Sequence, residues 1–166
     1  YANAAITAGV TDAEIEVAAV SKVTGESALT GVYKAFEANG VQLDSKRTEV
    51  AQQELEVTNK IAQENANQKG FDSSKLDKAM IEIKKELAEL KQKQGQLATK
   101  EDIERIINDA LKNNSLQNVI SKDQINALVA FAQNYQNTSA IDSKQVLEQL
   151  NSLSKSVGEK INSLVE

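Results

Sequence analysis

Residues that commonly perform chemistry are scarce in this chain. It contains neither Cys nor His, which removes thiol nucleophiles, Cys-based zinc sites and the most common general acid–base. Serine is followed by lysine at several places, including Ser21-Lys22, Ser121-Lys122 and Ser143-Lys144. A catalytic Ser–Lys pair needs a buried lysine, whereas these pairs fall at expected helix starts or on polar faces. We therefore interpret them as helix caps followed by solvated lysines.

Carboxylates and glycines do not indicate a site either. Glu101-Asp102 and the Glu14/Glu16 pair could bind Ca²⁺, but no D-x-D-x-D-G loop accompanies them. Carboxylates at a helix start are also favourable for the helix dipole, which is the interpretation we prefer. Neither a GxxxxGK[ST] nor a GxGxxG motif occurs, so nothing predicts a phosphate cradle. We predict no catalytic residue, no metal ligand and no cofactor.

Charge and hydropathy restrict the partners that the sequence favours. The 19 basic and 24 acidic residues are well mixed and give a net charge of −5, which disfavours nucleic acid as a partner. No run of about 18 apolar residues occurs, so we predict no membrane span. The chain begins at Tyr1 rather than Met, and we interpret this start as a cut in a longer protein.

Composition predicts a mainly α protein, built as an antiparallel helical hairpin or bundle. Hydrophobic residues make up 40% of the chain, aromatics only 4%, and proline is absent, which suits thin helix-on-helix packing. Residues 1–42 differ, because an alternating apolar pattern over 12–20 predicts a strand between a helix that ends near Gly9 and a helix over 27–38. A capping box at Thr11-x-x-Glu14 is the alternative to the strand. We expect 1–42 to be the remnant of an N-terminal α/β module.

Residues 43–95 are predicted to form a long helical hairpin, with 44–66 packed against 75–93. Asp44 is a plausible N-cap, and Gly70 and Gly95 mark a turn and an end. The second helix carries a heptad seam over 76–90. The seam consists of Leu76, Met80, Ile83, Leu87 and Leu90.

Residues 96–166 are predicted to form a C-terminal helical region with a weak 22-residue repeat. Thr99-Lys100, Ser121-Lys122 and Ser143-Lys144 each precede an apolar helical face at that spacing. Either a duplication or an ordinary helical domain would give this pattern. The third copy continues into a second seam over 146–164, and either seam could support homo-oligomers.

Phe131 and Tyr135 lie one helical turn apart in the second copy of the repeat. Core packing is the interpretation we favour. The alternative is that they line a hydrophobic groove for a partner helix or peptide, which makes them the candidate partner-binding residues.

The first forty residues carry a family resemblance. Tyr1-Ala2-Asn3-Ala4, the segment TAGV at 7–10 and the segment ALTGVYKAFE at 28–37 resemble domain-of-unknown-function family 1002, the uncharacterised YpuA-like secreted proteins of Firmicutes. The resemblance implies a Gram-positive, extracellular or cell-envelope protein whose secretion signal lies upstream, with this chain as its C-terminal half. The family carries no established activity, so it assigns no functional residue.

Two functional interpretations remain open from the sequence. The first is a non-enzymatic extracytoplasmic helical module that binds an unknown protein or cell-envelope partner. It rests on the absence of recognisable catalytic residues and on helices that carry an apolar seam on one face and polar residues on the others. The second is a scaffold or lid of an enzyme whose active site lies in a missing N-terminal half.

Overall fold

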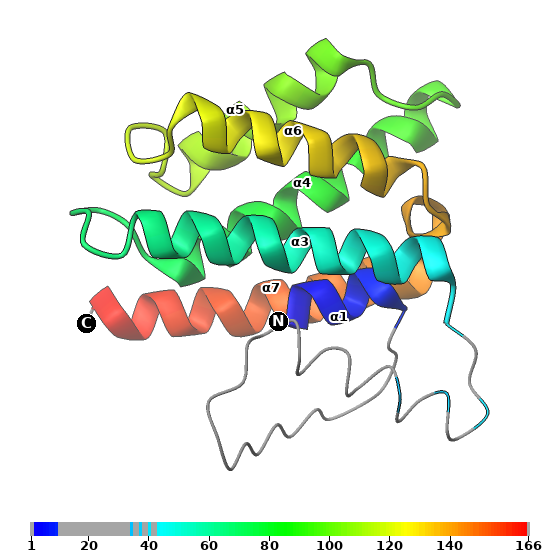
Figure 1. The fold of residues 1–166 in the computed structure, drawn as a ribbon, viewed down its shortest axis with the longest axis horizontal. Helices are drawn as coiled ribbons and strands as arrows, with labels where there is room; N and C mark the ends of the chain where they lie inside the picture. Colours follow the sequence, from blue (N-terminus) through cyan, green and yellow to red (C-terminus); the bar gives the residue numbers. More distant parts are fainter. Residues whose placement is uncertain (1, 10–33, 35–36, 38–39, 41–42, 166) are drawn as a thin grey trace.

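The computed structural model describes residues 2–9, 34, 37, 40 and 43–165. Within this part of the chain the order of elements is helical throughout (Figure 1). The helices are α1 (Ala2–Ala8), α3 (Ser45–Glu64), α4 (Ser73–Gln94), α5 (Lys100–Asn113), α6 (Lys122–Gln136), the short 3-10 helix η1 (Ser139–Asp142) and α7 (Lys144–Val165).

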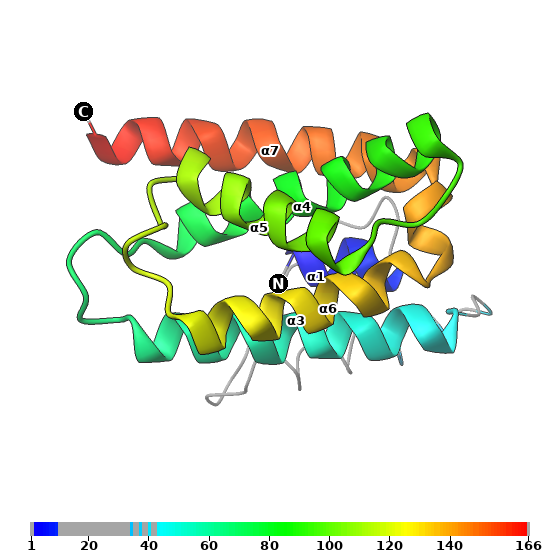
Figure 2. The same cartoon turned by 90° about the horizontal axis from the view of Figure 1, so that it is seen from above.

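Helix α4 lies at the centre of the bundle and contacts α1, α5, α6, η1 and α7. Seen from above, α3 and α6 lie along one side and α7 along the other, with α4 and α5 between them (Figure 2). The short α1 lies between α3 and α7, and it contacts both. The beginning of the described chain is therefore packed against segments that lie far away in sequence.

The mainly α prediction is confirmed, whereas the predicted α/β remnant finds no support. The predicted strand at 12–20 lies outside the described residues, and so does nearly all of the helix predicted over 27–38. The residues that are described contain no strand. The helix predicted to end at Gly9 is present as α1, and the Gly9 amide donates to the carbonyl of Ile6 at 3.0 Å.

Local capping signals set the helix starts where the sequence predicted them. The Asp44 carboxylate accepts hydrogen bonds from the first amides of α3. Thr99 and Ser121 each close a capping box, with Asp102 and Gln124 as the reciprocal partners. Each box satisfies two backbone amides that a helix start leaves without intrahelical partners. The 22-residue spacing of the repeat is thus a spacing of helix starts.

The seam over 76–90 is buried, but its main partners differ from the predicted ones. Leu76, Met80, Ile83 and Leu87 are at most 2% exposed. Helix α4 packs mainly on α5 and α7, while α3 packs mainly on α1 and α6. The sparse apolar stripe of α3 offers little area for a separate two-helix hairpin. A central α4 surrounded by several helices buries more apolar surface. The predicted boundaries after residues 42 and 95 stay predictions.

The second seam is also turned into the bundle over part of its length. Val146 and Leu150 of α7 are 3% and 0% exposed, and Val157 is 9% exposed. These side chains join the same apolar cluster as those of α4. Self-association through 76–90 or 146–164 stays a prediction, and it would use the less buried edges of seams that this chain already covers.

Two glycines should respond oppositely to substitution by alanine. Gly95 follows α4 with a φ of +67°, a conformation that costs an L-residue about 1 kcal/mol. Gly158 lies within α7, and a Cβ added there meets nothing within 4 Å. We expect Gly95→Ala to lower the free energy of unfolding by about 1 kcal/mol and Gly158→Ala to raise it by about 0.5–1 kcal/mol. Urea unfolding followed by circular dichroism measures both, and a shift in the same direction for the two variants would contradict the assigned conformations.

Candidate functional site

Polar groups gather in the interior where α1, α3 and α4 meet. Asn3, Thr7, Glu54 and Lys84 are at most 5% exposed, and we refer to them as the buried polar cluster. Asn3 and Thr7 lie one turn apart on α1, while Glu54 comes from α3 and Lys84 from α4. Burying a charge without a partner costs free energy, so buried charged groups need a specific arrangement around them. The buried polar cluster is therefore the first candidate for a functional site.

The ammonium group of Lys84 is saturated by hydrogen bonds. Its Nζ lies 2.7 Å from Oε1 of Glu54 and donates to Oε2 at 2.8 Å. It also donates to the backbone carbonyl and to the side-chain Oδ1 of Asn3, both at 3.0 Å. A lysine has three donors, so no donor is left to face the apolar surroundings.

The other members of the cluster hold Glu54 and Asn3 in place. The hydroxyl of Thr7 donates to Oε1 of Glu54 at 2.7 Å. The side-chain amide of Asn3 donates to the backbone carbonyl of Asp77 at 3.0 Å, which turns its Oδ1 toward Lys84. Each buried charge in the cluster therefore has an oppositely charged partner and further hydrogen bonds.

Tyr135 and Phe131 lie beside this cluster in the core. They are 1% and 0% exposed, their ring centroids are 5.8 Å apart, and Nζ of Lys84 lies 5.9 Å from the centroid of the Tyr135 ring. A cation in this position is attracted by the electron-rich ring face. Their core position matches the interpretation favoured from sequence, and their role in binding a partner stays a prediction.

The end of α1 is held by Arg47 of α3. Its Nε donates to the carbonyl of Thr7 at 2.9 Å and its Nη2 to the carbonyl of Ile6 at 3.1 Å. A cation at a helix C-terminus binds carbonyls without intrahelical partners and is favoured by the helix dipole. Burial lowers the pKa of Arg47, and the nearby Tyr135 and Asp44 counteract this effect. Helix α1 is thus bound by charged side chains near its start and at its end.

Burial dominates the electrostatics of the cluster. Desolvation lowers the pKa of Lys84, while the charge and hydrogen bonds of Glu54 act in the opposite direction. The same burial raises the pKa of Tyr135 well above its usual value, and the negative charge of Glu54 adds to the effect. Both shifts favour the uncharged form of the side chain.

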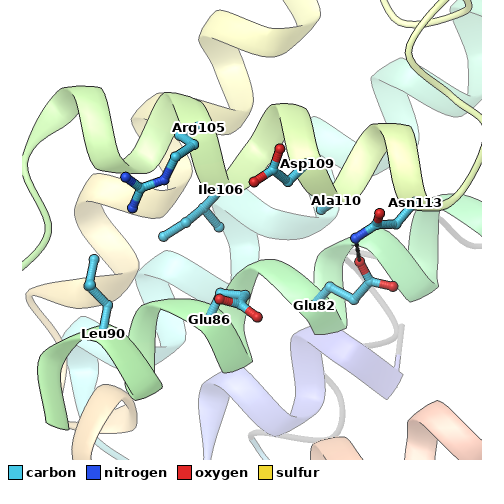
Figure 3. Close-up of a pocket in the computed structure, with 8 residues that line it drawn as sticks. All are labelled: Glu82, Glu86, Leu90, Arg105, Ile106, Asp109, Ala110 and Asn113. Atoms are coloured by element: carbon cyan, nitrogen blue, oxygen red, sulfur yellow. Dashed lines mark hydrogen bonds between the residues drawn. The ribbon is translucent and has the colours of Figure 1, made fainter. Parts of the chain in front are cut away.

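Two surface grooves lined by described residues are places where a ligand could bind. One lies between α4 and α5 and has a volume of about 180 Å³. Figure 3 shows Glu82 and Glu86 of α4 on one side of it and Arg105, Asp109 and Asn113 of α5 on the other. The remaining lining residues are apolar. They are Leu90, Ile106 and Ala110.

The α4–α5 groove carries more negative than positive charge. It has three carboxylates and one guanidinium group. The amide of Asn113 donates to Glu82 at 3.5 Å, and Arg105 forms an exposed ion pair at 3.4 Å with Asp102. Among the described residues, neither Glu86 nor Asp109 forms an ion pair. These two carboxylates are exposed and available to a cationic partner.

A second groove lies between α3 and the end of α6. Its volume is about 410 Å³, and its lining is mostly polar. The lining residues are Lys46, Glu49, Val50, Gln53, Asn134, Asn137 and Thr138. Across it, the amide of Asn134 donates to the side-chain oxygen of Gln53 at 2.9 Å. This hydrogen bond links the two sides of the groove, as the one from Asn113 to Glu82 does in the α4–α5 groove.

Two of the described Ser–Lys neighbours cap helices, while Ser45, Ser74 and Ser154 lie within α3, α4 and α7. Ser121 caps α6, and the Ser143 hydroxyl accepts from the amide of Val146 at the start of α7. The adjacent Lys122 is exposed. Asp102 completes the capping box of α5. Glu14, Glu16 and the Ser21-Lys22 pair lie outside the described residues. In the described part of the chain, no group of three or more acidic residues is placed to hold a metal ion.

The buried polar cluster was not predicted from the sequence. Glu54 stands where α3 would continue its apolar stripe, four residues after Val50 and three before Val57. Lys84 shares a second buried face of α4 with Ile81. A charged residue inside an apolar helical stripe was the available signal. Since surface lysines and glutamates are common on helices, that signal alone does not distinguish a buried pair from a solvated one.

Comparison with known proteins assigns the chain to a family. Residues 1–153 match the family described as "Protein of unknown function (DUF1002)", and the chain belongs to this family. One relative is the "Uncharacterized protein YpuA" of Bacillus subtilis (strain 168), which is 36% identical over 152 residues. The match covers 90% of this chain and 48% of YpuA, so the chain spans about half the length of that relative. No solved structure matches. The described helices include none that is long and apolar enough to cross a membrane.

Removing one member of the buried ion pair should be costly. We expect Lys84→Met to lower the free energy of unfolding by about 3–5 kcal/mol, because it leaves Glu54 charged and buried. The matched control is Lys85→Met, at the neighbouring lysine, whose side chain is half-buried. This change should alter the free energy of unfolding by no more than about 0.5 kcal/mol. Combining Lys84→Met with Glu54→Leu should recover part of the loss. Urea unfolding measures all of these variants, and strictly additive losses would contradict the coupling.

Alkaline pH should destabilise the protein through Tyr135. A raised pKa in the folded state means that Tyr135 keeps its proton where the unfolded chain has lost it. Its contribution is therefore complete below its ordinary pKa of 10.0 and is lost above that value. The lost stability reaches at most about 1.4 kcal/mol per pH unit. We expect the free energy of unfolding of the Tyr135→Phe variant to decline less steeply with pH above about pH 10 than that of the wild type. Urea unfolding across pH tests this, and parallel profiles for wild type and variant would contradict it.

Proposed function

We propose that this chain is a non-enzymatic, extracytoplasmic helical module that binds a protein or cell-envelope partner through the α4–α5 groove. The observation that carries the proposal is the contrast between interior and surface. The charged groups best suited to chemistry, Lys84 and Glu54, are buried and saturated. The α4–α5 groove instead presents exposed carboxylates around an apolar floor.

Charge complementarity suggests the chemistry of the partner. Glu86 and Asp109 face the groove without ion pairs among the described residues, while Ile106 and Ala110 contribute apolar surface. A partner segment that carries Lys or Arg beside small apolar side chains would match both features. The extracytoplasmic location is implied by the family resemblance, and a chain without cysteine permits it.

A scaffold or lid role in an enzyme is the second candidate. The observation that favours it is that the chain spans only 48% of its relative YpuA, so the other half of such a protein could carry an active site. In that case the α4–α5 groove would face another part of the same protein. The two candidates therefore differ in whether the groove contacts a separate molecule.

Site-specific photo-crosslinking in the full-length protein distinguishes the candidates. A photoreactive residue at Asp109 should give adducts with a separate molecule outside the cytoplasm. The same residue at Glu56, which is exposed on α3, should give none. In a second version of the protein, the photoreactive residue replaces Glu86 and Asp109 is changed to Lys. This charge reversal should lower the yield of the adduct by about tenfold, which corresponds to about 1.4 kcal/mol of binding free energy. The Glu56→Lys control should leave it unchanged.

Two outcomes would contradict the binding module. Adducts confined to the full-length protein itself would favour the scaffold or lid. Equal adduct yields from Asp109 and Glu56 would show that the groove is not the binding surface.

A further inference from the structure

The buried polar cluster holds the side-chain amine of Lys84 against the side-chain carboxamide of Asn3. Nζ of Lys84 lies 3.0 Å from Oδ1 of Asn3, and the Glu54 carboxylate lies 2.7 Å from the same Nζ. The side chains of Lys84 and Glu54 are 0% and 1% exposed. The Lys84 amine thus contacts both a carboxamide and a carboxylate away from water, and these are the groups that an amide exchange reaction requires.

We propose that Lys84 and Asn3 become joined by an intramolecular isopeptide bond, with Glu54 as the proton carrier. The bond connects Nζ of Lys84 to Cγ of Asn3. It fastens α1 covalently to α4, across 81 positions of the sequence. The hydrogen-bonded cluster described above is the reactant arrangement of this reaction.

The reaction balances without an oxidant, a reductant or a co-reactant. Glu54 first takes a proton from the Lys84 ammonium, which leaves a neutral amine and a carboxylic acid. The amine nitrogen attacks Cγ of Asn3, and the C=O bond opens to a tetrahedral carbon. Through the Glu54 carboxyl, a proton passes from Nζ to Nδ2, the bond from Cγ to Nδ2 breaks, and ammonia leaves. The products are the isopeptide amide, ammonia and protonated Glu54.

The geometry prepares each participant. The hydrogen bond from Nδ2 of Asn3 to the carbonyl of Asp77 fixes the orientation of the carboxamide. Since a C=O bond is about 1.2 Å long and Nζ lies 3.0 Å from Oδ1, Cγ of Asn3 lies at most about 4.2 Å from Nζ, and a near-attack arrangement needs roughly 3–3.5 Å. Desolvation lowers the pKa of Lys84 and thereby favours the amine that attacks. The Tyr135 ring, 5.9 Å from Nζ, adds an apolar wall.

Peptide mapping of the purified full-length protein tests the proposal. Trypsin should release residues 79–85 joined to the peptide that ends at Lys22, because the modified Lys84 is no longer cleaved. The mass of the joined species should be one ammonia below the sum of the two peptides. Fragmentation should place the link between Asn3 and Lys84. Recovery of the peptide that ends at Lys22 and of residues 79–84, unlinked and at full mass, from folded protein would overturn the proposal.

Variants separate this reaction from other losses of ammonia. Glu54→Gln, Lys84→Arg and Asn3→Ser should each abolish the joined species, whereas Lys85→Arg should retain the link between Asn3 and Lys84. Three variants are used because any one of them could fail to fold, and the wild-type map decides the question without them.

Cyclisation at Asn39-Gly40 would also release ammonia. That loss lies in the tryptic peptide 35–46 and joins no second peptide. If it accounted for the whole mass difference, the isopeptide bond would be absent and the proposal wrong.

Discussion

The buried pair of Lys84 and Glu54 is the interaction on which the arrangement of the N-terminal helix depends. Taking two charges out of water costs several kcal/mol per ion, and their attraction compensates only when hydrogen bonds satisfy the remaining donors and acceptors. Asn3 and Thr7 supply those bonds from α1. The pair therefore requires α1, and α1, with seven residues, is too short to be a stable helix alone.

The position of α4 explains why one set of polar groups is buried and another lies at the surface. Helices surround α4 on several sides, so both its apolar seam and Lys84 are covered. Its remaining face borders α5, where Glu82 and Glu86 stay at the surface. One helix thus supplies the buried charge and one wall of the exposed groove. A change in the tilt of α4 would alter both, which links the packing of the core to the shape of the surface.

Features encoded within a few residues could be predicted from the sequence. The caps at Asp44, Thr99 and Ser121 depend on side chains within three positions of the backbone groups they bind, and the seam of α4 follows from apolar spacing. The partners of that seam could not be predicted, because several helices offered comparable stripes. The buried cluster was also beyond reach, since Lys84 meets groups that lie 30 and 81 positions away.

The capping boxes at 99–102 and 121–124 have a further consequence for variation in the chain. Because each box sets its helix start through residues of its own, the segment before it carries no information about where the helix begins. Insertions or deletions in those connecting segments would change the residue number at which a helix starts, but its first turn would keep the same capping residues. Length differences among relatives should therefore lie outside the boxes themselves.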